Sequence, residues 1–132
     1  MSNISTCLDL QNMKQSLSGK YQLTEDINCN GTLFHPIGSY SLPFTGTLEG
    51  NRFKINNLTI NRNSNFIGIF SYTKGAIISN IIFQDFFINT CSTCQNVALV
   101  AGQSNDTMFF NITLTSSGKI NKVSGNCKST FF

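Results

Sequence analysis

Short runs in which apolar and polar residues alternate recur along this chain with one shared pattern. Ile55–Ile60 (Ile-Asn-Asn-Leu-Thr-Ile) is echoed by Ile78–Phe83 and by Phe109–Leu114, at intervals of 23 and 31 residues. In each run an asparagine precedes an apolar residue, a free position and a second apolar residue. A period of this length with strand-type residues predicts a solenoid whose coils bury their apolar faces by stacking. We expect the equivalent asparagines to form one stacked ladder: Asn57, Asn80 and Asn111.

A second pair of apolar runs follows these motifs in the same order. Asn65–Phe70 comes after the first run, much as Asn96–Ala101 comes after the second, and polar turn residues bound both. Their length and boundaries predict strands. Because no amphipathic helix of useful length separates them, the doubly wound α/β folds are excluded. Parallel pairing must then arise from the chain winding around itself.

Five pieces of sequence occur in a fixed order from about Lys20 onward. They are Tyr21–Ile27, Pro36–Gly38, Phe44–Asn51, Ile55–Ile60 and Ile67–Phe70. In order and spacing they resemble the GLUG-motif proteins, parallel β-helix adhesins and large repetitive surface proteins. The resemblance implies an all-β, single-stranded, right-handed parallel β-helix and a role at a cell surface. Three residues depart from the motif, where aspartate, glycine and glycine are usual: Glu49, Arg52 and Ser71.

Chain length limits the number of coils. With 132 residues, we expect one domain, and coils of 23 to 31 residues predict about five turns. Residues 20–132 should form the β-helix, and residues 1–19 an N-terminal segment that belongs to the same domain. Only 11% of residues are charged, and Phe is abundant. Stacked Phe, Ile, Leu and Val can therefore fill a narrow core.

The N-terminal segment has a helical pattern. Thr6 can accept a capping hydrogen bond near Asp9, and Gly19 is placed to end the element. We predict a short helix over residues 8–18 that caps the first coil and covers strand edges. The alternative is a helix that binds a partner, although a helix this short needs tertiary packing to form. Three apolar residues recur at helical spacing: Leu10, Met13 and Leu17.

The C-terminal end shows no matching cap. Ser129–Phe132 finishes on two aromatic residues, so the last coil should present an open edge. Three explanations remain: the chain is part of a longer repeat protein, the end docks onto another copy, or the last residues fold back over the core. The second would build a filament through heterologous contacts.

Five cysteines without a Cys/His metal pattern predict an oxidising compartment. Cys7, at the start of the expected helix, and Cys29, just after the first strand segment, are the expected pair and would join helix to coil. Cys91 and Cys94 have CxxC spacing, but no βαβ pattern that would favour a redox motif surrounds them. An odd count leaves at least one cysteine free or bonded to another chain. Cys91–Cys94 and Cys94–Cys127 are the alternatives for the second bond.

Several asparagines lie in Asn-x-Ser/Thr acceptor sequences. Asn30 and Asn105 fall in expected loops and are the favoured glycosylation sites. Asn57 and Asn111 lie in the repeated strand motif, where a role in the asparagine ladder is favoured over a glycan. Asn3 is also a less favoured glycosylation site than Asn30 and Asn105. Residues 1–20 lack the apolar run of a signal peptide, and no segment is apolar enough to span a membrane. We expect a secreted or cell-surface protein whose leader is not part of this chain.

Charge and acidic residues give little indication of catalysis. The net charge is +3 and the nine basic residues are scattered, so nucleic-acid binding has little support. Glu25 and Asp26 adjoin in a strand and should face opposite sides. The pairing of Asp26 with Glu49 one coil away is the only candidate for glycoside chemistry or calcium. His35, the only histidine, beside a proline, is read as a surface or turn residue.

These features predict a noncatalytic extracellular module, structural or adhesive, glycosylated, and part of a surface coat or filament. Its expected partners are other copies or neighbouring repeat modules at the coil ends, and possible surface glycans; we expect no cofactor, metal, nucleic acid or membrane insertion. The alternative is a carbohydrate-binding or carbohydrate-active β-helix.

Overall fold

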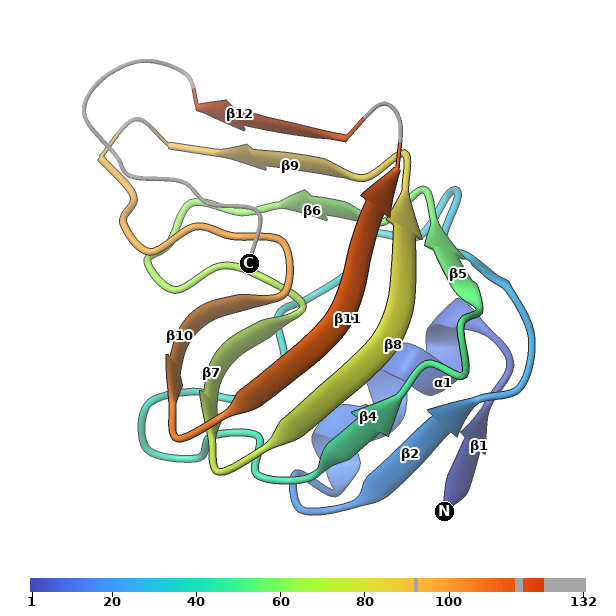
Figure 1. Cartoon of the computed structure of the whole chain (residues 1–132). Coiled ribbons are helices and arrows are strands. Elements are labelled where there is room, and N and C mark those ends of the chain that lie inside the picture. The colour runs from blue at the N-terminus through green and yellow to red at the C-terminus, as the bar shows by residue number, and fades with distance from the viewer. Residues whose placement is uncertain (92, 116–117, 123–132) are drawn as a thin grey trace.

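The structure, a computed structural model, describes residues 1–91, 93–115 and 118–122 and is a parallel β-solenoid (Figure 1). Two short helical elements lie near its start, α1 (Cys7–Gln11) and the 3₁₀ helix η1 (Asn12–Gln15). The strands are β1 (Ser2–Ile4), β2 (Lys20–Leu23), β3 (Ile27–Asn28), β4 (Thr47–Glu49), β5 (Lys54–Asn56), β6 (Thr59–Asn61), β7 (Phe70–Lys74), β8 (Ile77–Gln84), β9 (Phe87–Thr90), β10 (Ala101–Asn105), β11 (Met108–Thr115) and β12 (Lys119–Lys122).

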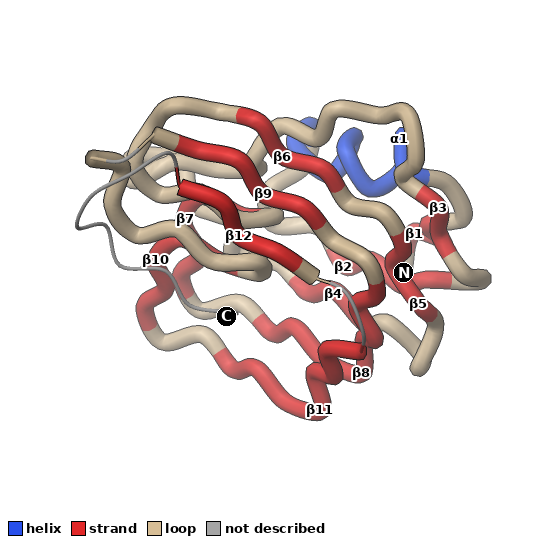
Figure 2. The backbone as a smooth tube through the Cα atoms, turned by 90° about the horizontal axis from the view of Figure 1, so that it is seen from above, coloured by secondary structure: helices blue, strands red, loops and turns tan. Residues whose placement is uncertain are grey.

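Every strand pairing among the described residues is parallel, and each joins one coil to the next. In the largest sheet the order β1, β2, β4, β8 runs on to β11. Along the second half of β8 the partner is β5, which in turn pairs with β3. A second sheet contains β6, β9 and β12, which lie side by side in Figure 2, and a third contains β7 and β10. The parallel pairing needs no crossover helix, because the chain winds around itself.

The solenoid has about three turns, fewer than the five expected from the motif intervals. Lys20, Thr47 and Ile77 are register partners that begin successive turns, and Met108 begins a partial fourth. Side-chain contacts between adjacent coils join residues 28 to 32 positions apart. The 23-residue interval was misleading because it joins two different corners of the coil.

At most corners of the coil, a residue other than glycine adopts left-handed backbone. Asparagine and aspartate tolerate this conformation best, since their short side chains can bond locally. This explains why asparagine recurs between short apolar runs. The described residues with positive φ other than glycine are Asn51, Arg52, Asn57, Phe66, Asn80, Asp85, Asn96, Asp106 and Asn111.

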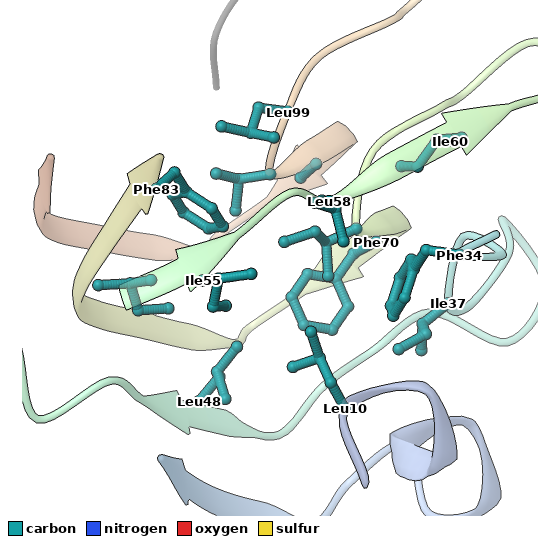
Figure 3. Close-up of a cluster of buried hydrophobic side chains, with 14 of the residues drawn as sticks. Leu10, Phe34, Ile37, Leu48, Ile55, Leu58, Ile60, Phe70, Phe83 and Leu99 are labelled. Carbon is teal, nitrogen blue, oxygen red and sulfur yellow. The ribbon is translucent and has the colours of Figure 1, made fainter. Parts of the chain in front are cut away.

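The core is a continuous stack of aliphatic and phenylalanine side chains inside the coils (Figure 3). The rings of Phe44 and Phe70 stack with centroids 4.3 Å apart, and Tyr21 lies 6.5 Å from Phe44. Leu10 points from the helix into the cluster that contains Phe70, and it is fully buried. Contacts of this kind make the coils one cooperative unit.

The N-terminal helix is shorter than expected. Its helical residues end at Gln15, and the 3₁₀ turn of η1 replaces the second half of the predicted helix over 8–18. Thr6 is the N-cap, as predicted, and its hydroxyl accepts the backbone N–H of Asp9 at 3.0 Å. Gly19 does not end the helix. It lies against the ring of Tyr21, which leaves no room for a Cβ atom.

Candidate functional site

A column of polar side chains runs along one corner of the coil stack. Asn111 donates its side-chain amide to Asn80 Oδ1 at 2.6 Å, and Asn80 donates to both carboxylate oxygens of Glu49 at 3.0 and 3.1 Å. The backbone N–H of Asn51 also donates to Glu49. The column spans three coils and consumes most of the hydrogen-bonding capacity of Glu49.

Asn57 does not belong to this column, so the predicted ladder of three is wrong at that position. Its side-chain amide donates instead to Asn28 Oδ1 at 3.0 Å, and its backbone N–H donates to Gln84. The register pairs Ile55 with Phe83, which puts Asn57 beyond the end of β8. Each coil has more than one left-handed corner, and the same local motif fits either corner.

Another column of asparagines, on the sheet of β6, β9 and β12, was not predicted from the sequence. Asn121 donates to Asn89 Oδ1 at 3.0 Å, and Asn89 donates to Asn61 Oδ1 at 3.2 Å. These asparagines lie in register on β6, β9 and β12. An available signal was the dipeptide Ile-Asn, which recurs in all three strands.

Two disulfide bonds are present among the described residues. Cys7–Cys29 joins α1 to the segment after β3, as expected from the sequence. Cys91–Cys94 is the second bond, and the side chain of Cys94 is buried. Cys127 lies outside the described residues, and so does the chain end at 129–132 whose docking or folding back was considered.

The acceptor asparagines differ in what their side chains already bind. Asn57 and Asn111 use the amide nitrogen, the atom that would carry a glycan, in hydrogen bonds to neighbouring asparagines. Asn30 and Asn105 are both exposed. Asn30 lies in a turn, whereas Asn105 is the last residue of β10 and does not lie in a loop as expected. Asn3 is exposed on β1, where its Oδ1 accepts from a glutamine. Glycosylation of Asn30 and Asn105 stays a prediction.

The acidic residues do not converge. Asp26 Oδ1 accepts the backbone N–H of Lys54 at 2.8 Å, whereas Glu49 accepts from Asn51 and Asn80, so each of these carboxylates is bound by donors of its own. The pKa of Asp9 is lowered, chiefly because the backbone N–H of Ser5 donates to its carboxylate. Among the described residues, no three His, Cys, Asp or Glu side chains lie close enough to hold a metal ion together.

His35 lies at the surface, and its backbone is held by a buried glutamine. Gln11 donates to the carbonyl of His35 at 3.0 Å and accepts its N–H at 2.8 Å. This pair ties α1 to the loop before Pro36. The contacts involve the backbone of His35, and its exposed position agrees with the prediction of a surface residue.

Two hollows on the outer surface each contain an arginine. The corner hollow, of about 200 Å³, is lined by Arg52, Asn80, Ile82, Asn111 and Thr113. The tyrosine hollow, of about 280 Å³, lies elsewhere on the coil. It is lined by Pro36, Gly38, Ser39, Tyr40, Arg62, Ser64, Asn65, Phe66 and Ser71. Both are candidate binding features of the described surface.

Comparison with known proteins finds one informative similarity. The chain is 35% identical over 106 residues to halomucin of Haloquadratum walsbyi, and the match covers 72% of this chain. It spans about 1% of the length of that relative. No family model matches the chain, and no solved structure matches it. Across the described residues, no helix is long and apolar enough to cross a membrane.

Proposed function

We propose that this chain is a noncatalytic extracellular surface module, structural or adhesive, that forms part of a larger coat or filament. The observation that carries the proposal is the open rim of the solenoid. β10, β11 and β12 each pair on one side only among the described strands. Unpaired strand edges bind further strands, and solenoids extend by that contact.

The rim also presents apolar side chains of the interior type. Phe109, Ile112 and Leu114 in β11 are only half-buried, although their register partners in β8 are fully buried. A neighbouring module or a second copy would cover them. Because hydrophobic stabilisation grows with the apolar area removed from water, this contact would add stability to both units.

The opposite end is proposed to be closed by the N-terminal segment. Leu10 and Met13 are fully buried against the first coil, and Cys7–Cys29 fixes α1 there. Capping one end and leaving the other open would give assembly a direction. Terminal caps of this kind keep solenoids from adding units at both ends.

Three observations support an extracellular setting. Disulfide bonds persist in oxidising compartments, and two join described cysteines of this small chain. Asn30 and Asn105 are exposed acceptors for glycans. The relative is named halomucin, and this chain matches a small part of it, as a module of a much longer protein would. The resemblance to GLUG-motif surface proteins points in the same direction.

Native mass spectrometry of the chain made through a secretory route tests the proposal. We expect hexose increments and masses above that of one chain, with the assembly weakened in Ile112→Arg. The control is Thr113→Arg, which adds the same charge on the outer side of the same strand. A monomer without glycans at every protein concentration, or equal effects of the two variants, would contradict the proposal.

A further inference from the structure

The tyrosine hollow joins two segments that are far apart in sequence. One wall is the loop after Gly38, closed by a hydrogen bond from the Ser39 N–H to the Leu42 carbonyl at 3.0 Å. The facing wall is the segment between β6 and β7, which contributes Arg62 and Asn65. Only the coil winding brings these walls together.

Tyr40 gives this hollow an exposed aromatic surface. Its side chain is 78% exposed, yet its ring is held edge-on against Tyr72, with centroids 5.4 Å apart and planes at 68°. Tyr72 is itself buried. An exposed aromatic ring offers an apolar face on which a ligand can stack, and a tyrosine side chain has few torsions to lose on binding.

Arg62 gives the same hollow an uncompensated positive charge. The backbone N–H of Arg62 bonds to Asn89, but its guanidinium has no hydrogen-bond or ion-pair partner among the described residues. None of the described residues that line the hollow carries a carboxylate. A guanidinium binds a carboxylate through two parallel hydrogen bonds, which gives geometric as well as electrostatic selectivity.

Phe66 is an unusual residue for its backbone conformation. It has φ of 62°, where the equivalent corner of the next coil has Asn96 with φ of 58°. The N–H of Phe66 bonds to Gln95, and Gly102 lies so close to its backbone that a Cβ atom would clash. Such strain, of about 1–3 kcal/mol, persists where the surroundings enforce it and is found at functional sites.

We propose that the tyrosine hollow binds an acidic sugar residue, a uronic acid within a glycan. The C–H face of the sugar ring would lie on Tyr40, its carboxylate on Arg62, and its hydroxyls on Ser39, Ser64 and Ser71. The hollow is smaller than the roughly 300–1,000 Å³ pockets that hold drug-sized ligands, so it fits one or two sugar residues. This activity goes beyond the proposed structural role and does not depend on assembly.

The corner hollow lacks this combination and serves as an internal control. Arg52 is also exposed, but no aromatic side chain is among the described residues that line this hollow. Glu49 lies one hydrogen bond away through Asn80 and opposes an anion. Arg52→Gln and Arg62→Gln therefore remove the same charge from two hollows, of which only one is expected to bind the glycan.

Calorimetric titration with a trimer of galacturonic acid, and with a neutral galactose trimer, tests the proposal. We expect the acidic trimer to bind and to bind more weakly at high salt, because exposed charges are screened. Arg62→Gln and Tyr40→Ala should each weaken binding roughly tenfold, the loss of one charged or stacking contact. Tyr40→Phe keeps the ring and should bind like the original chain, as should Arg52→Gln.

Three outcomes would overturn the proposal: no binding of the acidic trimer, equal binding of both trimers, or equal weakening by Arg52→Gln and Arg62→Gln. Circular dichroism of each variant verifies folding. The titration reads binding to the single chain, whereas the native mass of the same samples reads assembly. Failure of glycan binding is thereby distinguished from failure of the surface-module proposal.

Discussion

The first coil and the last described coil of this solenoid use similar residues to different effect. Leu23, in β2, is fully buried and has Ile4 of β1 as a register partner, and the Cys7–Cys29 bond joins α1 to the segment after β3. Leu114, in β11, faces the same interior but is half-buried, with a strand partner on one side only. A leucine side chain is thus removed from water completely in β2 and only in part in β11, so its burial contributes less to stability in β11.

The difference shows that burial in a solenoid depends on neighbours in the stack more than on local pattern. The apolar face of each coil is buried by the coils on either side of it. A terminal coil lacks one neighbour, so its stability is completed by a cap or by another unit.

We expect the largest effect from two matched truncations, Leu23→Ala and Leu114→Ala. The first should lower the free energy of unfolding by about 2–5 kcal/mol, since it opens a cavity at a fully buried site. The second should cost less than half as much, because its site is already partly hydrated. Chemical denaturation measures both. Equal losses would mean that the rim is as well packed as the first coil.

The two disulfides give the next contrast. Replacing Cys7 and Cys29 together with serine should cost about 2–4 kcal/mol, because their bond closes a loop across 22 positions in the unfolded chain. The Cys91–Cys94 bond spans 3 positions, constrains little, and its double serine variant should lose much less. Thermal unfolding under non-reducing conditions tests the order. A larger loss at Cys91–Cys94 would reverse this account.

A smaller effect is expected within the corner column. Asn80→Gly keeps a residue that tolerates the left-handed backbone but removes the amide that donates to Glu49. We expect a loss of about 1–2 kcal/mol, because a carboxylate in the column loses two hydrogen bonds. Asn111→Gly, at the end of the column, should cost less. Urea titration compares them, and an unchanged stability of Asn80→Gly would show that the column is not stabilising.

The smallest effect concerns acid at the N-terminal helix. The pKa of Asp9 is lowered from 3.8 in the folded chain, so its contribution is present above pH 3.8 and lost as pH falls through the lower folded value. Asp9 is well solvated, so Asp9→Asn should cost at most about 0.5 kcal/mol. Stability measured between pH 2 and 6 should show a shallower acid dependence in the variant. An identical pH profile would exclude this role.

Much of this fold follows from the local pattern of residues. The recurring Asn-apolar-x-apolar motif predicted parallel coils without helices, and the sequence also predicted the Thr6 helix cap and the Cys7–Cys29 bond. The number of turns could not be predicted, because motifs at different corners resemble one another. Asn57 illustrates this: its motif matches that of Asn80, yet the strand register puts the two on different corners.

That this chain winds into stacked strands follows from its local pattern, because strand-length apolar runs between left-handed turn residues are buried by stacking. Which residues share a face depends on how the coils pack in three dimensions. The tertiary structure aligned Asn61, Asn89 and Asn121, gave β10, β11 and β12 one strand partner each among the described residues, and brought Tyr40 into the same hollow as Arg62. The reason is that register and loop length fix contacts between coils, and neither is encoded within a single short motif.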